Sequence, residues 1–88
     1  MNKNVKTDIL KIYNGFEAYR MYNKLFNNNH KFTSHQIDES ILLLYKYSDE
    51  DTDQEIRCKF IVNDSYKTSV YEKEYNKRHY KTISKLIS

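Results

Sequence analysis

The fold class depends on residues 41–62, which read ILLLYKYSDEDTDQEIRCKFIV. Residues 55–62 alternate polar and apolar side chains over almost their whole length and are rich in β-branched and aromatic types, which favours a half-buried strand. Residues 41–47 form an apolar run of strand length. Because the polar, turn-prone residues 48–54 lie between them, the two runs predict an antiparallel β-hairpin with a long acidic loop. A strand over residues 31–37 would extend this hairpin to a three-stranded meander.

Two capping-box patterns support a competing, all-α interpretation of the same region. Each pattern has a threonine three positions before a glutamine or glutamate whose side chain can accept from the threonine backbone N–H, as at many helix starts. The two patterns are residues 33–36 (Thr-x-x-Gln) and 52–55 (Thr-x-x-Glu). Read from the second box, residues 52–61 and the segment from Ser65 onward become two helices, which would form a helix-turn-helix.

The spacing of this second interpretation is similar to that of the sigma-factor-like units of phage late-gene activators. The similarity is carried by Thr52-Asp53-Gln54-Glu55-Ile56, then Phe60, Val62, Ser65 and Val70. It implies DNA binding through the helix-turn-helix. Such units need a small residue soon after the Glu-Ile pair and usually a glycine in the turn, but this chain has Arg57 and Ile61 there. We therefore prefer the hairpin.

Helical periodicity flanks the central region on both sides. Apolar and aromatic residues recur at spacings of three and four over residues 7–27 and again over residues 69–87. We therefore expect one small α+β domain over residues 1–88, with an N-terminal helix, the hairpin or meander, and a C-terminal helix, both helices packing on one sheet face. The expected core is Ile9, Ile12, Phe16, Tyr19, Leu42 or Leu43, Ile56, Cys58, Phe60, Val62, Ile83 and Leu86.

Composition indicates a small folded protein of a reducing compartment. Hydrophobic residues make up 39% and charged residues 31%, which keeps the chain away from the composition of disordered proteins. The single cysteine cannot form an intramolecular disulfide. Since no apolar run has the length of a signal peptide or a membrane span, we expect a cytoplasmic protein without membrane contact. Abundant Lys, Asn, Ile and Tyr indicate an A+T-rich genome. We therefore expect the gene to come from a low-G+C bacterium, or from a phage or mobile element living in one.

No pattern in the chain names a reaction, a metal or a cofactor. One glycine cannot supply a phosphate-binding loop, and His30, His35, Cys58 and His79 lack the spacing of metal ligands. Cys58 falls on the apolar face of its predicted strand, where a thiol is inert. We therefore expect neither catalysis nor a cofactor.

Two contact surfaces are predicted, one from clustered charge and one from tyrosine. The chain has nine tyrosines in 88 residues, and tyrosine and arginine are enriched at interface hot spots. The first is the acidic loop, and the second is a basic, aromatic stretch of the C-terminal helix. The acidic loop comprises Asp49, Glu50, Asp51 and Asp53, and the helix surface comprises Tyr71, Tyr75, Lys77, Arg78, Tyr80 and Lys81.

Two functional hypotheses follow. The first is a non-catalytic protein-binding regulator, a phage or mobile-element inhibitor of a host or rival protein machine, of the anti-defence or anti-CRISPR type. Its acidic loop would occupy a nucleic-acid-binding groove by charge mimicry while the helix docks beside it. The alternative is a small DNA-binding transcriptional regulator that uses residues 52–85 as a helix-turn-helix. The expected partner is thus a protein, with nucleic acid and a second copy of the chain as further candidates.

Overall fold

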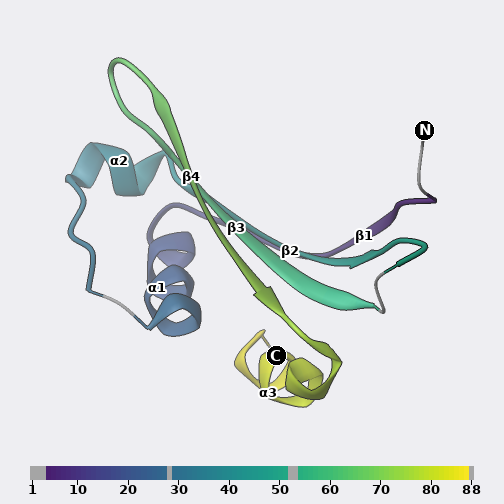
Figure 1. The fold of residues 1–88 in the computed structure, drawn as a ribbon. Helices are drawn as coiled ribbons and strands as arrows, with labels where there is room; N and C mark the ends of the chain where they lie inside the picture. Colours follow the sequence, from purple (N-terminus) through teal and green to yellow (C-terminus); the bar gives the residue numbers. More distant parts are fainter. Residues whose placement is uncertain (1–3, 28, 52–53, 88) are drawn as a thin grey trace.

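The structure is a computed structural model that describes residues 4–27, 29–51 and 54–87. It is a single antiparallel sheet of four strands in the order β1-β2-β3-β4, with helices on one of its two faces (Figure 1). The elements in chain order are β1 (Lys6–Asn14), α1 (Gly15–Phe26), α2 (Ser34–Asp38), β2 (Ile41–Ser48), β3 (Glu55–Asn63), β4 (Thr68–Tyr75), the 3-10 turn η1 (Lys77–His79) and α3 (Tyr80–Ile87).

The predicted hairpin of β2 and β3 is confirmed. Leu42 pairs with Phe60 and Leu44 with Cys58, so alternate residues of both strands point to the same face. The helix-turn-helix interpretation is wrong, because β3 pairs with β2 on one side and with β4 on the other. Thr52, which would open that motif's capping box, lies outside the described residues.

The predicted N-terminal helix over residues 7–27 is wrong in its first half, which forms β1 and pairs with β2. A register shift between Ile9 and Lys11 explains the misleading periodicity. The extra residue of this bulge places Ile9 and Ile12 on the same face although they are three positions apart. A bulged strand therefore imitates the spacing of a helix, and the true helix begins only at Gly15.

The predicted C-terminal helix over residues 69–87 is also wrong in its first half. Residues 68–75 form β4 instead, and only residues 80–87 form a helix after the short η1 turn. Tyr71 and Tyr75 are four positions apart, which suits one face of a helix and one face of a strand equally. Pairing with the outer edge of β3 decides for the strand.

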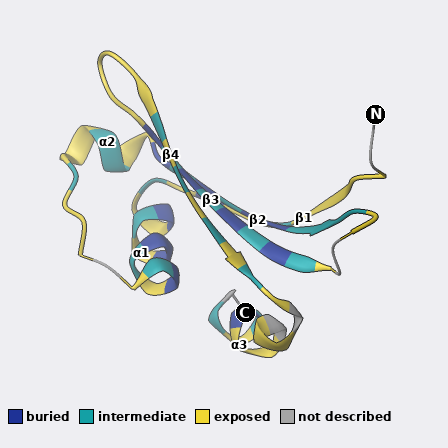
Figure 2. Cartoon of the chain, viewed as in Figure 1, coloured by how far each residue is buried: buried dark blue, intermediate teal, exposed yellow. Residues whose placement is uncertain are grey.

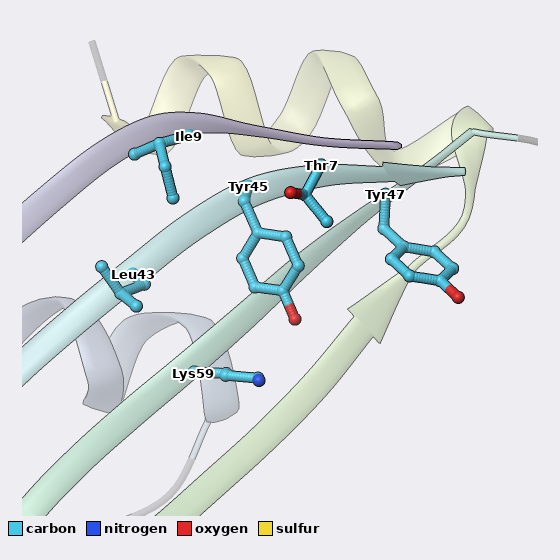
Figure 3. Close-up of a pocket in the computed structure, with 6 residues that line it drawn as sticks. All are labelled: Thr7, Ile9, Leu43, Tyr45, Tyr47 and Lys59. Atoms are coloured by element: carbon cyan, nitrogen blue, oxygen red, sulfur yellow. The ribbon is translucent and has the colours of Figure 1, made fainter. Parts of the chain in front are cut away.

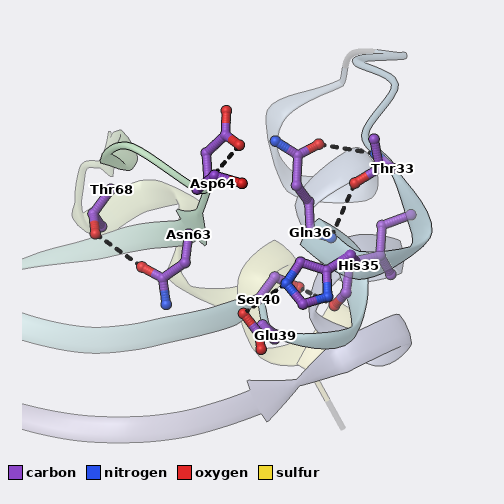
Figure 4. Close-up of polar contacts among 10 residues, drawn as sticks. Thr33, His35, Gln36, Glu39, Ser40, Asn63, Asp64 and Thr68 are labelled. Atoms are coloured by element: carbon purple, nitrogen blue, oxygen red, sulfur yellow. Dashed lines mark hydrogen bonds and ion pairs between the residues drawn. The ribbon is translucent and has the colours of Figure 1, made fainter.

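The segment predicted as a third strand, residues 31–37, contains the short helix α2 instead. Thr33 accepts a hydrogen bond from the Gln36 backbone N–H (3.2 Å), and its own N–H donates to Gln36 Oε1 (2.9 Å), as Figure 4 shows. This is the capping box of the competing interpretation, which is correct at this place.

The core lies between the sheet and the helices, on one face only (Figure 2). Tyr22 of α1 stacks on Phe60 of β3 with ring centroids 4.2 Å apart, and Ile83 of α3 joins the same buried cluster. The expected core members Leu42, Ile56, Cys58, Phe60, Val62 and Ile83 are buried, while Tyr19 and Leu86 pack partly buried against them. Ile9, Ile12 and Phe16 were expected in the core and are instead exposed by 54%, 51% and 66%.

The turn from β1 into α1 is fixed by Gly15, whose φ of 60° lies in the left-handed region. Its backbone N–H donates to the Ser40 carbonyl (2.9 Å), and the single proton of the buried Ser40 hydroxyl is shared between the carbonyls of Ile37 (2.7 Å) and Gly15 (3.2 Å). At the other end of α1, Asn27 caps the helix with a φ of 51°.

Replacing Gly15 with Ala is expected to lower the free energy of unfolding by about 1 to 2 kcal/mol, because an L side chain is strained at this φ. The added Cβ meets only the Asp38 carbonyl oxygen at 3.6 Å, an ordinary contact, so the loss reports the backbone alone. Asn27→Gly is the matched control and should leave stability unchanged or raise it. Urea unfolding measures both, and equal stability of Gly15→Ala and the unmodified protein would contradict the assigned conformation.

Candidate functional site

The candidate site is the open face of the sheet, meaning the face that points away from the helices. No helix within the described ranges covers it (Figure 1). The strand register assigns to it Thr7, Ile9, Ile12, Ile41, Leu43, Tyr45, Tyr47, Glu55, Arg57, Lys59, Ile61, Val70, Glu72 and Glu74.

One half of the open face is apolar. Ile9 and Ile12 of β1 are half exposed and lie beside Tyr45 and Leu43 of β2, their partners in the register. Ile41 and Ile61 continue the apolar surface across one end of the sheet to Val70, which is 49% exposed. An exposed apolar surface of this kind marks interaction sites on soluble proteins.

The rest of the open face, on β3 and β4 beyond Ile61 and Val70, carries ion pairs. Arg57 contacts Glu55 at 3.0 Å and Glu74 at 3.8 Å, and its guanidinium lies 3.5 Å from the centre of the Tyr47 ring. Lys59 lies 3.8 Å from Glu72. The pairs with Glu74 and Glu72, whose side chains are about 60% exposed, contribute little to stability. They do place a carboxylate next to each of the two cations, Arg57 and Lys59.

A shallow hollow lies where the two halves meet (Figure 3). Its volume is about 260 Å³, below the roughly 300 to 1,000 Å³ of pockets that enclose drug-sized ligands. The hollow is lined by Thr7, Ile9, Leu43, Tyr45, Tyr47 and Lys59. Its walls are mainly aliphatic and aromatic, with the Lys59 ammonium and the hydroxyls of the threonine and the tyrosines among them.

The acidic loop lies between β2 and β3, as predicted. Its first member is attached to the open face, since the Tyr47 hydroxyl donates to Asp49 Oδ2 (2.9 Å). Asp49 Oδ1 in turn accepts from the backbone N–H of Asp51 (2.9 Å), and Glu50 is exposed between them. Asp53 lies outside the described residues. The role of this loop in binding a partner remains a prediction.

The residues of the predicted basic helix are divided among β4, η1 and α3. Tyr71 and Tyr75 lie on the inner face of β4 and pack partly buried against the core. Arg78 is exposed in η1 and Lys81 is exposed in α3. The side chains of the two remaining members, Lys77 and Tyr80, lie outside the described part of the chain.

Tyr75 has a structural role, because its hydroxyl donates to the Leu25 carbonyl at the C-terminal end of α1. The ammonium of Lys73 donates to the same carbonyl at 3.1 Å. A cation and a donor at a helix C-terminus satisfy free carbonyls and complement the helix dipole. β4 thereby attaches α1 to the sheet.

Sequence reasoning missed the open face as a site. A signal was present in residues 41–45, where apolar side chains occupy consecutive positions and therefore both faces of the strand. Such a strand needs cover on both sides, and the expected helices were assigned to one side only.

The only cysteine, Cys58, is fully buried on the inner face, opposite Lys73 in the register. Burial raises the pKa of its thiol to about 12, against a smaller opposing effect of the Lys73 charge. The thiol is therefore protonated and unreactive at neutral pH. In the described ranges no three metal-ligating side chains gather. None of the helices described is both long and apolar enough to cross a membrane.

Alkaline pH is expected to destabilise the fold through Cys58 and Tyr75. Burial raises the pKa of Cys58 from 9.0 to about 12 and, with the nearby Cys58, raises that of Tyr75 from 10.0 to about 12. Folding raises both pKa values, so the unfolded chain loses these protons at a lower pH than the folded protein does. The stabilisation is therefore fully present below the pKa values of the unfolded chain and is lost as the pH rises toward about 12.

Between about pH 8 and pH 10, the unmodified protein should therefore lose about 1.4 kcal/mol more free energy of unfolding than Cys58→Ala. Urea unfolding of both proteins at each pH measures the difference. Parallel losses in the two proteins would show that the thiol is not buried as described.

Comparison with known protein families, with curated proteins and with solved structures gives no match to this chain. The function is therefore inferred from the open face and its surroundings.

Proposed function

We propose that this protein is a non-catalytic protein-binding module whose open sheet face contacts its partner. The observation that carries the proposal is the group of half-exposed aliphatic side chains Ile9, Ile12 and Val70 on a face that no described helix covers. Covering one such side chain contributes roughly 1 kcal/mol, because about half of its surface is still in water. A partner that covers all of them gains several times this amount.

The dimensions of the molecule also support this proposal. Its extents are 40 × 33 × 18 Å, so it is a slab one sheet and one helix layer thick. A broad face of these dimensions has room for the roughly 800 Å² that each partner buries in a specific interface of standard size. The sheet is rigid, so little conformational entropy is lost on binding.

A protein partner suits the open face better than a nucleic acid does. Phosphate binding needs available cations, but Arg57 and Lys59 on this face are each next to a glutamate. Binding of single strands also needs exposed aromatic rings for base stacking, and Tyr45 is only 8% exposed. The aliphatic surface offers nothing that recognises a base or a phosphate.

Within this class, we retain the role of an inhibitor of a larger host or rival protein machine, including the anti-CRISPR type. Support comes from the continuity of two surfaces, since the hydrogen bond from Tyr47 to Asp49 holds the acidic loop at one end of the apolar face. A domain with both features can cover an apolar patch and a neighbouring basic groove together. In this proposal the open face, together with the acidic loop, takes the place of the basic helix surface.

Charged substitutions on the open face are expected to abolish partner binding without unfolding the protein. Ile12→Lys and Val70→Lys each place a cation on the apolar surface at a half-exposed position. Tyr66→Lys is the matched control, because Tyr66 is 96% exposed in the turn between β3 and β4. The tagged proteins are used to capture partners from lysate of a low-G+C bacterium, and circular dichroism checks the fold.

The unmodified protein and Tyr66→Lys should retain a discrete protein that both open-face variants lose by about tenfold or more. Retention of that protein by both open-face variants would refute the proposed contact surface. Recovery of nuclease-sensitive material alone would favour a nucleic-acid partner.

A further inference from the structure

We infer that the protein forms a symmetric dimer in which β4 pairs antiparallel with β4 of a second copy, with Tyr71 at the centre of the pair. This inference goes beyond the proposed function, because it concerns the outer edge of the sheet and not its open face.

The outer edge of β4 is long and regular. β4 is the last strand of the sheet, and all of Thr68–Tyr75 pairs with β3 on the other side without a register shift (Figure 1). Within the described ranges, no strand and no hydrogen bond from another element reaches the backbone of its outer edge. Every second residue of β4 therefore presents a backbone N–H and C=O that this sheet does not pair. Such an edge is a template for a strand of another chain.

The opposite edge of the sheet is less suited to pairing. β1 has a bulge between Ile9 and Lys11, and a bulge bends a strand and interrupts its regular hydrogen bonding. Bulges and prolines are devices by which proteins protect exposed strand edges, and β4 has neither. The edge that is regular enough to receive a second strand is therefore that of β4.

The charged side chains of β4 do not protect its edge, because its own chain holds each of them. Both glutamates of β4 lie 3.8 Å from a cation of β3, one from Arg57 and the other from Lys59. The ammonium of Lys73 donates to the Leu25 carbonyl of α1 at 3.1 Å. Charges that protect an edge project toward an incoming strand. Those of β4 are directed toward β3 and α1 instead.

Symmetry restricts the register of the pair. Opposite residues of an antiparallel pair point to the same face, so in a two-fold dimer one residue lies opposite its own copy. The longest overlap of β4 with itself places Tyr71 or Glu72 at this centre, because these are the two middle residues of Thr68–Tyr75. A centre at Glu72 sets two carboxylates directly opposite each other, which is destabilising. A centre at Tyr71 pairs two aromatic rings, which is stabilising.

The register centred on Tyr71 is also compatible with the other side chains of β4. It places Val70 opposite Glu72 of the second copy, and it sets no two like charges of β4 directly opposite each other. Within one copy, Tyr71 lies opposite Phe60 of β3 and is only partly buried. A second Tyr71 therefore extends this aromatic row across the joint between the two sheets.

The two-fold axis of this dimer is perpendicular to the sheet, so two four-stranded sheets join edge to edge. Both open faces then lie on one side of the joined sheet, and both helical layers lie on the other. Since each copy contributes one strand, the contact buries less surface than an interface of standard size. We therefore expect monomer and dimer to exchange at concentrations that can be reached in solution.

Sedimentation equilibrium of the full chain at rising concentration measures the dissociation constant of the dimer. The unmodified protein should be a monomer when dilute and a dimer when concentrated. Val70→Lys faces Glu72 of the second copy and should lower the constant about fivefold, whereas Val70→Glu should raise it about fivefold, because each pair occurs twice in the dimer. Circular dichroism checks that the variants are folded.

The matched control is Ile12→Glu, which introduces the same charge on the other edge strand, at a position that is about half exposed, as Val70 is. It should leave the dissociation constant unchanged. Amide hydrogen exchange of the unmodified protein, followed by nuclear magnetic resonance, locates the contact. Raising the concentration should slow exchange at alternate residues of β4 and leave β1 unaffected.

A monomer at every concentration would overturn the inference. Equal constants for the two Val70 variants, or a dimer that Ile12→Glu abolishes, would overturn it as well, the latter because the open face would then join the two copies. The capture experiment tests the proposed function separately, since Val70→Lys should lose the captured protein and yet tighten the dimer.

Discussion

The strand β2 is apolar toward both faces of the sheet, and the remaining structure depends on how each face is covered. Leu42 and Leu44 point to the inner face and are fully buried under the helices. Leu43 and Tyr45 point the other way, where neighbouring side chains of the sheet shield them and no described helix does. A helical layer thus covers one face of this strand, and none of the described helices covers the other.

The inner face is closed by contacts that join distant parts of the chain. α1 enters through the left-handed Gly15, which is hydrogen-bonded to the segment just before β2. It packs through Tyr22 on Phe60, and its last turn is attached to β4 through the Leu25 carbonyl. A domain of this size has a thin margin of stability, so these few long-range contacts carry much of it.

The open face combines rigidity with chemical asymmetry. Hydrogen-bonded strands fix the positions of its side chains, in contrast to a contact surface built on loops. Ion pairs occupy part of β3 and β4, while the apolar surface runs from β1 and β2 to Ile61 and Val70 and adjoins the acidic loop. We propose that this division suits a partner surface with an apolar centre.

The sequence alone determined the elements whose signal is local. Alternation over almost the whole of residues 55–62 predicted β3 and the four core residues that it contributes, and the polar segment before it predicted the acidic loop. The capping box at Thr33 indicates α2 correctly, although the all-α interpretation that it supported is wrong for the rest of the region. Each of these features is set by residues close together in the sequence, so the sequence alone is enough to predict it.

Only the tertiary structure decided the identity of β1 and β4 and the existence of the open face. A bulge gives Ile9 and Ile12 the spacing of a helix, and Tyr71 and Tyr75 fit either periodicity, so pairing with β2 and β3 had to select the strand. The face left uncovered depends on where the helices pack. That choice is made by long-range contacts such as Tyr22 with Phe60, which no local pattern contains.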